Sequence, residues 1–221
     1  SKHLAEEYPF TKLHNKLSFA WNFPSSDFYS RFKVEKRYDE REPIVGFVGK
    51  LSVLKGASHL IKAIPLITQQ IPDVKFVLIG SPTDQIAKAI EELLKSHKTC
   101  VNHLHSVPHH HMPHHYNNMM LLVHPSYSEG GPPHVVLEAL ACGTPVLIAR
   151  VGAFAEIIEK NTLGFILNNR TPEALATQII SLLDKRDLLS KVSEHSAVWL
   201  REHITHEQAV SMWRKIFDKI T

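Results

Sequence analysis

The sequence predicts an α/β protein with a Rossmann-like, doubly wound parallel sheet of six strands and helices on both faces. Six short apolar runs lack polar alternation, which is typical of strands buried on both faces. Segments with apolar residues at helical spacing separate most of these runs. Repeated strand–helix–strand units of this length indicate parallel strands joined by helical crossovers.

The expected elements follow one another along the chain. Strands are expected at residues 43–50, 74–80, 100–108, 119–126, 144–152 and 164–168. Helices are expected at residues 57–70, 83–97, 134–143 and 171–185, in the histidine-rich stretch before residue 119, and twice more near the C-terminal end. Pro65 must bend the first helix or lie near its end. Thr171 is the expected N-cap of the helix at 171–185, with Pro172 at its first position.

Three parts divide the chain. Residues 1–42 are interpreted as the end of a preceding domain and an interdomain linker, with a short strand at 16–21 that Asn22-Phe23-Pro24 ends. Residues 43–190 form the α/β domain, and residues 191–221 form C-terminal helices. The first residue is not Met and the opening stretch resembles the middle of a chain, so we expect a piece of a larger protein.

Composition limits the class of protein. The 221 residues include 43% apolar residues, enough for a sizeable core, and the net charge of +3 gives no argument for nucleic acid as a partner. No apolar run reaches the roughly 18 residues of a membrane span. Cys100 and Cys142 have neither metal-ligand nor disulfide-framework spacing, which favours reduced thiols in a cytoplasmic protein.

Ligands on such a sheet bind beyond the carboxyl ends of the strands. The loops that meet there are residues 50–56, 80–84, 106–112, 125–133 and 150–155. Lys50 and Lys55 flank the first loop, just before a helix N-terminus, which suits a polyanion. Two solvated surface lysines are the alternative.

The stretch SEGGPPHVVLEALACGTPV carries two glutamates. Glu138 lies near the start of a helix, where it either caps that helix or accepts hydrogen bonds from a ligand such as vicinal sugar hydroxyls. Gly130 and Gly131 allow close backbone approach. Amides from His134 onward are free to bind anions. An ordinary turn with a helix-terminal carboxylate remains the alternative.

Together these segments resemble a known family. The series FVGKLxxxKG, FVLIG, HSVP and HPSYSEGGPPHVVLEALACGTPV is similar to the C-terminal, donor-binding domain of retaining GT-B glycosyltransferases of group 1, the superfamily of glycogen and sucrose synthases. The resemblance covers residues 43–183 and is densest at 125–146. It implies the C-terminal half of a GT-B fold and retaining transfer of a sugar from a nucleotide-diphosphate donor, such as a UDP- or GDP-sugar, to an acceptor.

The resemblance also implies roles for individual residues. Lys50 and Lys55 would hold the donor diphosphate, Glu129 would contact the transferred sugar, and Glu138 would accept hydrogen bonds from the ribose. Further donor-binding positions would be Gly49, Ser81, Ser106, Val107, Gly130, Gly131, His134, Val135 and Val136. The amides of the two valines would face the diphosphate, and Ser106 and Val107 would lie beside the nucleobase.

Two departures from the family pattern affect these roles. Lys50 stands where the family usually has arginine, so the charge remains but the bidentate fork is lost. The glutamates are nine residues apart instead of the family's usual eight, which makes the sugar-binding loop one residue longer. The longer loop affects the position of Glu129 more than that of Glu138, because the helix fixes Glu138.

The resemblance sets expectations for cofactors and partners as well. The sequence has no DxD-type motif, and two lysines can replace a divalent cation, so we expect no metal and no other cofactor. The partners would be a nucleotide sugar, a glycan, lipid or small-molecule acceptor, and an N-terminal GT-B domain. The enzyme would be cytoplasmic, with peripheral association at the cytoplasmic face of a membrane as an option.

Seven histidines lie between His103 and His115. They permit adventitious metal binding, but neither cysteine nor carboxylate completes a ligand set. His109 is a candidate for contact with the nucleobase, and Trp199 and Trp213 are interpreted as packing residues. Two alternatives to a transferase stay open: another GT-B sugar-nucleotide enzyme, such as an epimerase, and a non-catalytic histidine-rich module that binds metal or a partner.

Overall fold

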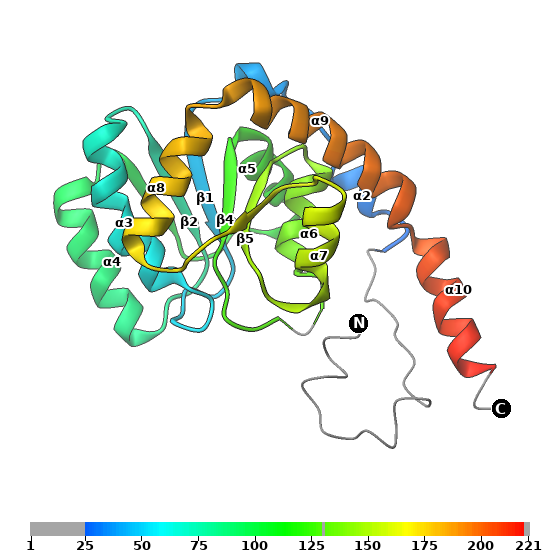
Figure 1. Ribbon diagram of the computed structural model, residues 1–221. Helices are drawn as coiled ribbons and strands as arrows, with labels where there is room; N and C mark the ends of the chain where they lie inside the picture. Colours follow the sequence, from blue (N-terminus) through cyan, green and yellow to red (C-terminus); the bar gives the residue numbers. More distant parts are fainter. Residues whose placement is uncertain (1–24, 130, 219–221) are drawn as a thin grey trace.

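The computed structural model describes residues 25–129 and 131–218, so the strand expected at 16–21 and Asn22-Phe23-Pro24 lie outside it. The described residues contain a six-stranded sheet in the order β3-β2-β1-β4-β5-β6, with every pair parallel (Figure 1). The strands are β1 (Ile44–Val48), β2 (Lys75–Ile79), β3 (Val101–Leu104), β4 (Leu121–His124), β5 (Val146–Ala149) and β6 (Phe165–Leu167). The predicted fold class is confirmed.

Helices connect and cover the strands. They are α2 (Phe28–Arg31), α3 (Ala57–Gln70), α4 (Asp84–His97), α5 (Met112–Asn118), α6 (His134–Ala141), α7 (Gly152–Lys160), α8 (Pro172–Leu183), α9 (Arg186–His203) and α10 (His206–Phe217), with 3-10 turns η2 (Tyr38–Glu40) and η3 (His109–His111). Pro65 lies inside α3, which continues to Gln70. The N-cap prediction for α8 is confirmed, because the Thr171 side chain accepts a hydrogen bond from the Ala174 amide.

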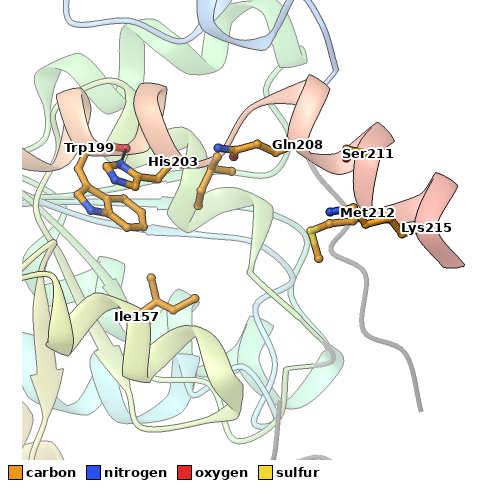
Figure 2. A pocket seen from close by; sticks show the side chains of 8 residues that line it. Ile157, Trp199, His203, Gln208, Ser211, Met212 and Lys215 are labelled. Carbon is orange, nitrogen blue, oxygen red and sulfur yellow. Dashed lines mark hydrogen bonds between the residues drawn. The ribbon is translucent and has the colours of Figure 1, made fainter. Parts of the chain in front are cut away.

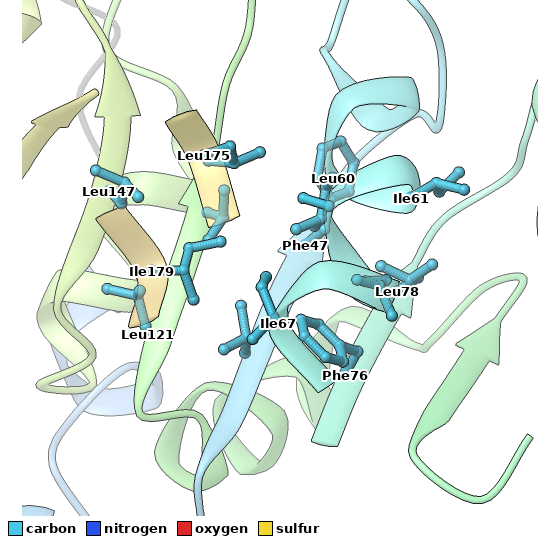
Figure 3. Packing of buried hydrophobic residues seen from close by; sticks show 14 of the residues in the cluster. Phe47, Leu60, Ile61, Ile67, Phe76, Leu78, Leu121, Leu147, Leu175 and Ile179 are labelled. Carbon is cyan, nitrogen blue, oxygen red and sulfur yellow. The ribbon is translucent and has the colours of Figure 1, made fainter. Parts of the chain in front are cut away.

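Both faces of the sheet are buried. Phe47 of β1 packs in the cluster formed with α3, α4 and α8, whereas its neighbour Val48 packs in the cluster formed with α5, α6 and α7. Figure 3 shows the first cluster, where Leu175 and Ile179 of α8 face the sheet beside α3. Side chains alternate between the two faces of a strand, so a sheet covered on both faces needs unbroken apolar strands.

The strand order places a topological switch point between β1 and β4. The connection after β1 leads to α3 on one face, and the connection after β4 leads to α6 on the other. At the neighbouring strand end, a Cβ on Gly80 would lie 1.9 Å from the Gly49 carbonyl oxygen, so the loops after β1 and β2 approach at a distance that glycine alone permits. The crevice at such a switch point is where open α/β sheets bind ligands.

The segment interpreted as a linker packs against the domain within the described residues. Phe28 and Phe32 are buried, and so is the guanidinium of Arg41. Arg41 donates to the carbonyls of Met119 and Cys142, at 3.0 and 2.8 Å, and its burial lowers its pKa to about 10. At the other expected boundary, α9 continues without a break past residue 190. The three-part division of the chain stays a prediction.

The C-terminal helices form a groove with α7. Its lining includes Ile157, Trp199, His203 and Met212, and Figure 2 shows these side chains around the space between α7, α9 and α10. Trp199 is partly buried, packs against the second core cluster and stacks on His203 with ring centroids 4.5 Å apart, which confirms its packing role, whereas Trp213 is 42% exposed. Within the described ranges, no helix has the length and apolar character needed to cross a bilayer.

Candidate functional site

Two loops at the switch point bring opposite charges together. Lys55, from the loop after β1, places its Nζ 2.6 Å from Oε1 of Glu129, in the loop after β4. The Glu129 side chain is 13% exposed and that of Lys55 is 31% exposed. The sequence separated these residues by 74 positions, and the structure confirms that their loops meet at one edge of the sheet.

Close backbone contacts hold the loop after β1 against the loop after β4. A Cβ on Gly56, whose φ is +75°, would lie 2.3 Å from the carbonyl oxygen of Pro125. The Tyr127 amide donates to the carbonyl of Leu54 at 2.9 Å. A glycine after Lys55 is therefore needed both for the left-handed backbone and for the close approach of the second loop.

His124 is a third member of this group. It is the last residue of β4, is 5% exposed, and places Nε2 2.8 Å from the same Oε1 of Glu129. Partial burial alone would raise the pKa of the Glu129 carboxyl, but the hydrogen bonds from His124 and Lys55 outweigh it and lower that pKa from 4.5 to about 2. Glu129 is therefore an ionised carboxylate at neutral pH.

Glu138 has a different environment on α6. It is 7% exposed, its Oε2 accepts a hydrogen bond from the buried Tyr116 hydroxyl at 2.8 Å, and its Oε1 lies 2.9 Å from His109 Nε2. Burial, together with the charge of Glu138, raises the Tyr116 pKa well above its ordinary value, so the hydroxyl keeps its proton and donates.

His109 links Glu138 to α2. Arg31 Nη1 lies 3.3 Å from His109 Nδ1. An arginine can only donate, so Nδ1 must accept and Nε2 must carry the proton that Glu138 receives. The structure thus places His109 on the carboxylate, with its ring 5.2 Å from that of Phe32. Its predicted contact with a nucleobase stays a prediction.

The N-terminus of α6 offers fewer free amides than the sequence suggested. The Val136 amide donates to the Pro133 carbonyl at 3.0 Å, and its predicted place beside a diphosphate stays a prediction. The first turn of this helix tightens onto Pro133 and uses that donor internally. In residues 25–129 and 131–218, the amides of His134 and Val135 have no hydrogen-bond partner, and both precede the buried part of the helix.

The other predicted residues lie around the same edge of the sheet. Lys50 and Ser106 are exposed, Val107 packs on the second core cluster, and the Ser81 hydroxyl lies 3.2 Å from His105 Nε2. Gly49 follows β1 with φ +129°. Gly131 is exposed, with no atom within 4 Å of a Cβ built on it, and Gly130 lies outside the described residues.

Three histidines of the stretch at 103–115 each contact a different residue. His103 Nε2 lies 3.0 Å from the Gly80 carbonyl oxygen, His105 contacts Ser81, and His109 contacts Glu138. The described part of the chain contains no group of three histidine, cysteine, aspartate or glutamate side chains placed to hold a metal ion.

Sequence reasoning missed His124 and Tyr116. His124 is the last residue of β4 and directly precedes the predicted loop at 125–133, so including the residue before each loop would have found it. Tyr116 gave no such signal, because its place in a histidine-rich helix does not reveal that its hydroxyl points toward α6. The role of Arg31 was equally hidden, since it lies 78 residues from His109.

Comparisons of the chain with family models, curated proteins and solved structures agree with one another. The family model described as glycosyl transferases group 1 matches residues 29–199. The chain is 32% identical to spore coat protein SA of Bacillus subtilis over 164 residues, which cover 70% of this chain and 44% of that protein. It is 28% identical to the D-inositol 3-phosphate glycosyltransferase of Corynebacterium urealyticum over 184 residues, covering 78% and 43%. The chain thus spans less than half the length of these relatives.

Solved structures share the fold. The C-terminal domain of the group 1 family protein LpcC from Francisella tularensis matches with a TM-score of 0.67 and 22% identity, covering 80% of this chain and 98% of that one. TarM from S. aureus, in a complex that includes UDP, matches with a TM-score of 0.78 and 19% identity, covering 98% and 41%. Anabaena HepE, in complex with UDP and glucose, matches with a TM-score of 0.71 and 19% identity, covering 91% and 56%. These likenesses confirm a C-terminal GT-B fold.

Proposed function

Since the chain belongs to the group 1 glycosyl transferases, we propose that it is the donor-binding domain of an enzyme that transfers a sugar from a nucleotide-diphosphate donor with retention of configuration. The acceptor is a glycan, a lipid or a small molecule, and an N-terminal GT-B domain completes the cleft. The free thiols of Cys100 and Cys142 support a cytoplasmic location for this enzyme.

One observation carries the proposal: Lys55 and Glu129 meet across the switch point, and the loop that carries Glu129 leads to the α6 N-terminus. A diphosphate needs positive charge and free amides, and Lys55 and the amides of His134 and Val135 supply both there. Sugar hydroxyls need an acceptor, and the ionised Glu129 supplies it. Few other ligands require both groups at one point.

Glu138 suits the ribose of the same donor. Two protein donors fix its carboxylate, and each carboxylate oxygen has a second acceptor site for a ribose hydroxyl. The leaving diphosphate gains charge as the anomeric carbon becomes oxocarbenium-like, and Lys50, Lys55 and the helix N-terminus stabilise that charge electrostatically. We therefore propose donor binding without a divalent cation.

Calorimetric titration with UDP, GDP and ADP in the presence of EDTA tests the proposal. We expect one of the three to bind with a Kd below 1 mM, and UDP is the first choice because HepE and TarM were solved with it. Lys55→Met should weaken that binding about 10- to 100-fold, as expected for loss of a charge-assisted hydrogen bond. Glu138→Gln should weaken it by a similar factor.

Lys75→Met is the matched control for charge. Lys75 begins β2 at the opposite edge of the sheet and pairs with Glu42 on the surface at 2.6 Å. The control should bind nucleotide with unchanged affinity. Failure of all three nucleotides to bind the folded wild-type chain would exclude the proposed function, and binding that needs added Mg²⁺ would exclude its metal-free form.

A further inference from the structure

Oε1 of Glu129 has two unlike partners. Lys55 reaches it at 2.6 Å from another loop through a flexible side chain that is 31% exposed. His124 reaches it at 2.8 Å from the last position of β4, with a side chain that is 6% exposed. The backbone of His124 is held in the sheet, where its strand pairs with β5 in register His124↔Ile148.

The surroundings of His124 determine which nitrogen carries its proton. Nδ1 is buried and has no hydrogen-bond partner within the described residues. A proton there would leave a buried N–H unsatisfied, which is costly. Nε2 faces an ionised carboxylate, so it must donate. His124 is therefore a donor held by its strand, and its bond to Glu129 does not depend on Lys55.

The proposed function requires Lys55 to change partners. An ammonium bound to Glu129 must turn toward the diphosphate when the donor arrives, because the diphosphate carries more charge. Glu129 Oε1 then loses one of its two partners at the moment when the sugar needs the carboxylate in place.

We propose that His124 is the positioning residue that keeps Glu129 in place for the transferred sugar while Lys55 turns to the diphosphate. This inference rests on the proposed function for its ligand, and it names the residue that makes the sugar subsite independent of the phosphate subsite. Glu129 keeps Oε1 on His124 and offers its remaining acceptor sites to sugar hydroxyls.

The first test needs no ligand. Carbon-13 NMR titration of the Glu129 carboxyl is compared in the wild type, Lys55→Met, His124→Phe and the double variant. In Lys55→Met we expect the Glu129 pKa to stay below 4.5, and in the double variant we expect a further rise of about one pH unit or more. A Glu129 pKa that reaches its ordinary value in Lys55→Met alone would overturn the anchoring role.

The second test compares UDP-glucose with UDP, or the GDP or ADP pair if that nucleotide binds. A residue acting through Glu129 affects the sugar, so His124→Phe should weaken UDP-glucose binding about 10-fold and leave UDP binding within about 2-fold. His124→Gln should restore most of the loss, because its amide places a donor near Nε2. His195→Phe, an exposed histidine of α9 near the Asn161 carbonyl, is the control.

These outcomes separate the two proposals. Equal weakening of UDP and UDP-glucose, or no weakening of either, would overturn the positioning role. If the wild type binds no nucleotide, the proposed function fails, and the ligand-free titration still decides whether His124 anchors Glu129. Thermal unfolding of each variant identifies any that do not fold, and His124→Leu, which also lacks a side-chain donor, then replaces His124→Phe in both tests.

Discussion

Glu129 and Glu138 are nine residues apart in one segment, yet the fold holds them in opposite ways. Glu129 lies in a loop and receives a cationic ammonium and an imidazole on one oxygen. Glu138 lies on a helix and receives a hydroxyl and an imidazole on separate oxygens. The first carboxylate is held by an imidazole from its own strand and an ammonium from another loop, and the second by a hydroxyl and an imidazole around a helix.

The difference matches two kinds of task. A helix fixes the Cβ of Glu138, so two neutral donors suffice to orient its carboxylate. A loop leaves Glu129 to be fixed by its side-chain partners, and one of them can leave for a more highly charged ligand. Of the partners of the two carboxylates, Lys55 on Glu129 is the one that a diphosphate can draw away.

Of the substitutions considered, replacing Gly56 should lower the free energy of unfolding most, because Gly56 lies between the loops that carry Lys55 and Glu129. Gly56→Ala places a Cβ 2.3 Å from the Pro125 carbonyl oxygen at φ +75°, which forces apart the loops that carry Lys55 and Glu129. We expect a loss of about 3 kcal/mol in the free energy of unfolding, measured by urea denaturation. Gly131→Ala is the control, since its Cβ meets no atom within 4 Å. Equal losses in both variants would refute this explanation.

Removal of one hydroxyl tests the helix carboxylate. Tyr116→Phe leaves Oε2 of a largely buried Glu138 without its donor, so we expect about 2 kcal/mol of destabilisation. Tyr127→Phe removes an exposed hydroxyl 2.6 Å from His59 Nε2, where water can take its place, and should cost less than about 0.5 kcal/mol. Thermal and urea unfolding measure both changes. A loss of stability no larger than that of Tyr127→Phe would mean that water replaces the Tyr116 hydroxyl.

Acid should reduce the contribution of Glu129 to the stability of the fold. The Glu129 pKa is lowered from 4.5 to about 2, so its stabilising contribution is complete above pH 4.5 and is lost as pH falls through 2. The stability advantage of the wild type over Glu129→Gln should therefore shrink by about 1 to 2 kcal/mol between pH 6 and pH 3, allowing for partial exposure. Exposed ion pairs such as Arg150–Glu159 cancel in this difference. A constant difference across this range would contradict the lowered pKa.

The smallest effect on stability is expected from replacing His109, the exposed partner of Glu138. His109→Phe removes a donor whose side chain is 55% exposed, and water can replace it on Oε1. We expect less than about 1 kcal/mol of destabilisation by urea unfolding, partly offset by contact with Phe32. Destabilisation equal to that of Tyr116→Phe would show that both oxygens depend equally on protein donors.

Much of the fold follows from local pattern. The apolar runs predicted every strand of the described sheet to within a few residues, because strands buried on both faces lack polar alternation. Thr171 and Pro172 fixed the start of α8 through capping chemistry that neighbours in sequence supply. The charged segment at 30–43 gave no sign that Arg41 would be buried, because the partners in the core that accept its hydrogen bonds lie 78 to 103 residues away.

The sequence by itself determined which strands are buried, which loops share the carboxyl edge, and that Lys55, Glu129 and Glu138 belong to that edge. Only the tertiary structure decided that His124 and Lys55 both contact one oxygen of Glu129. It also decided that Tyr116 and His109 each contact one oxygen of Glu138. The hydrogen bond from the Val136 amide to the Pro133 carbonyl was likewise not evident from the sequence. The reason is physical: strand and helix patterns arise from neighbours in sequence, whereas the partner of a carboxylate oxygen depends on the packing of distant elements and the rotamers that packing allows.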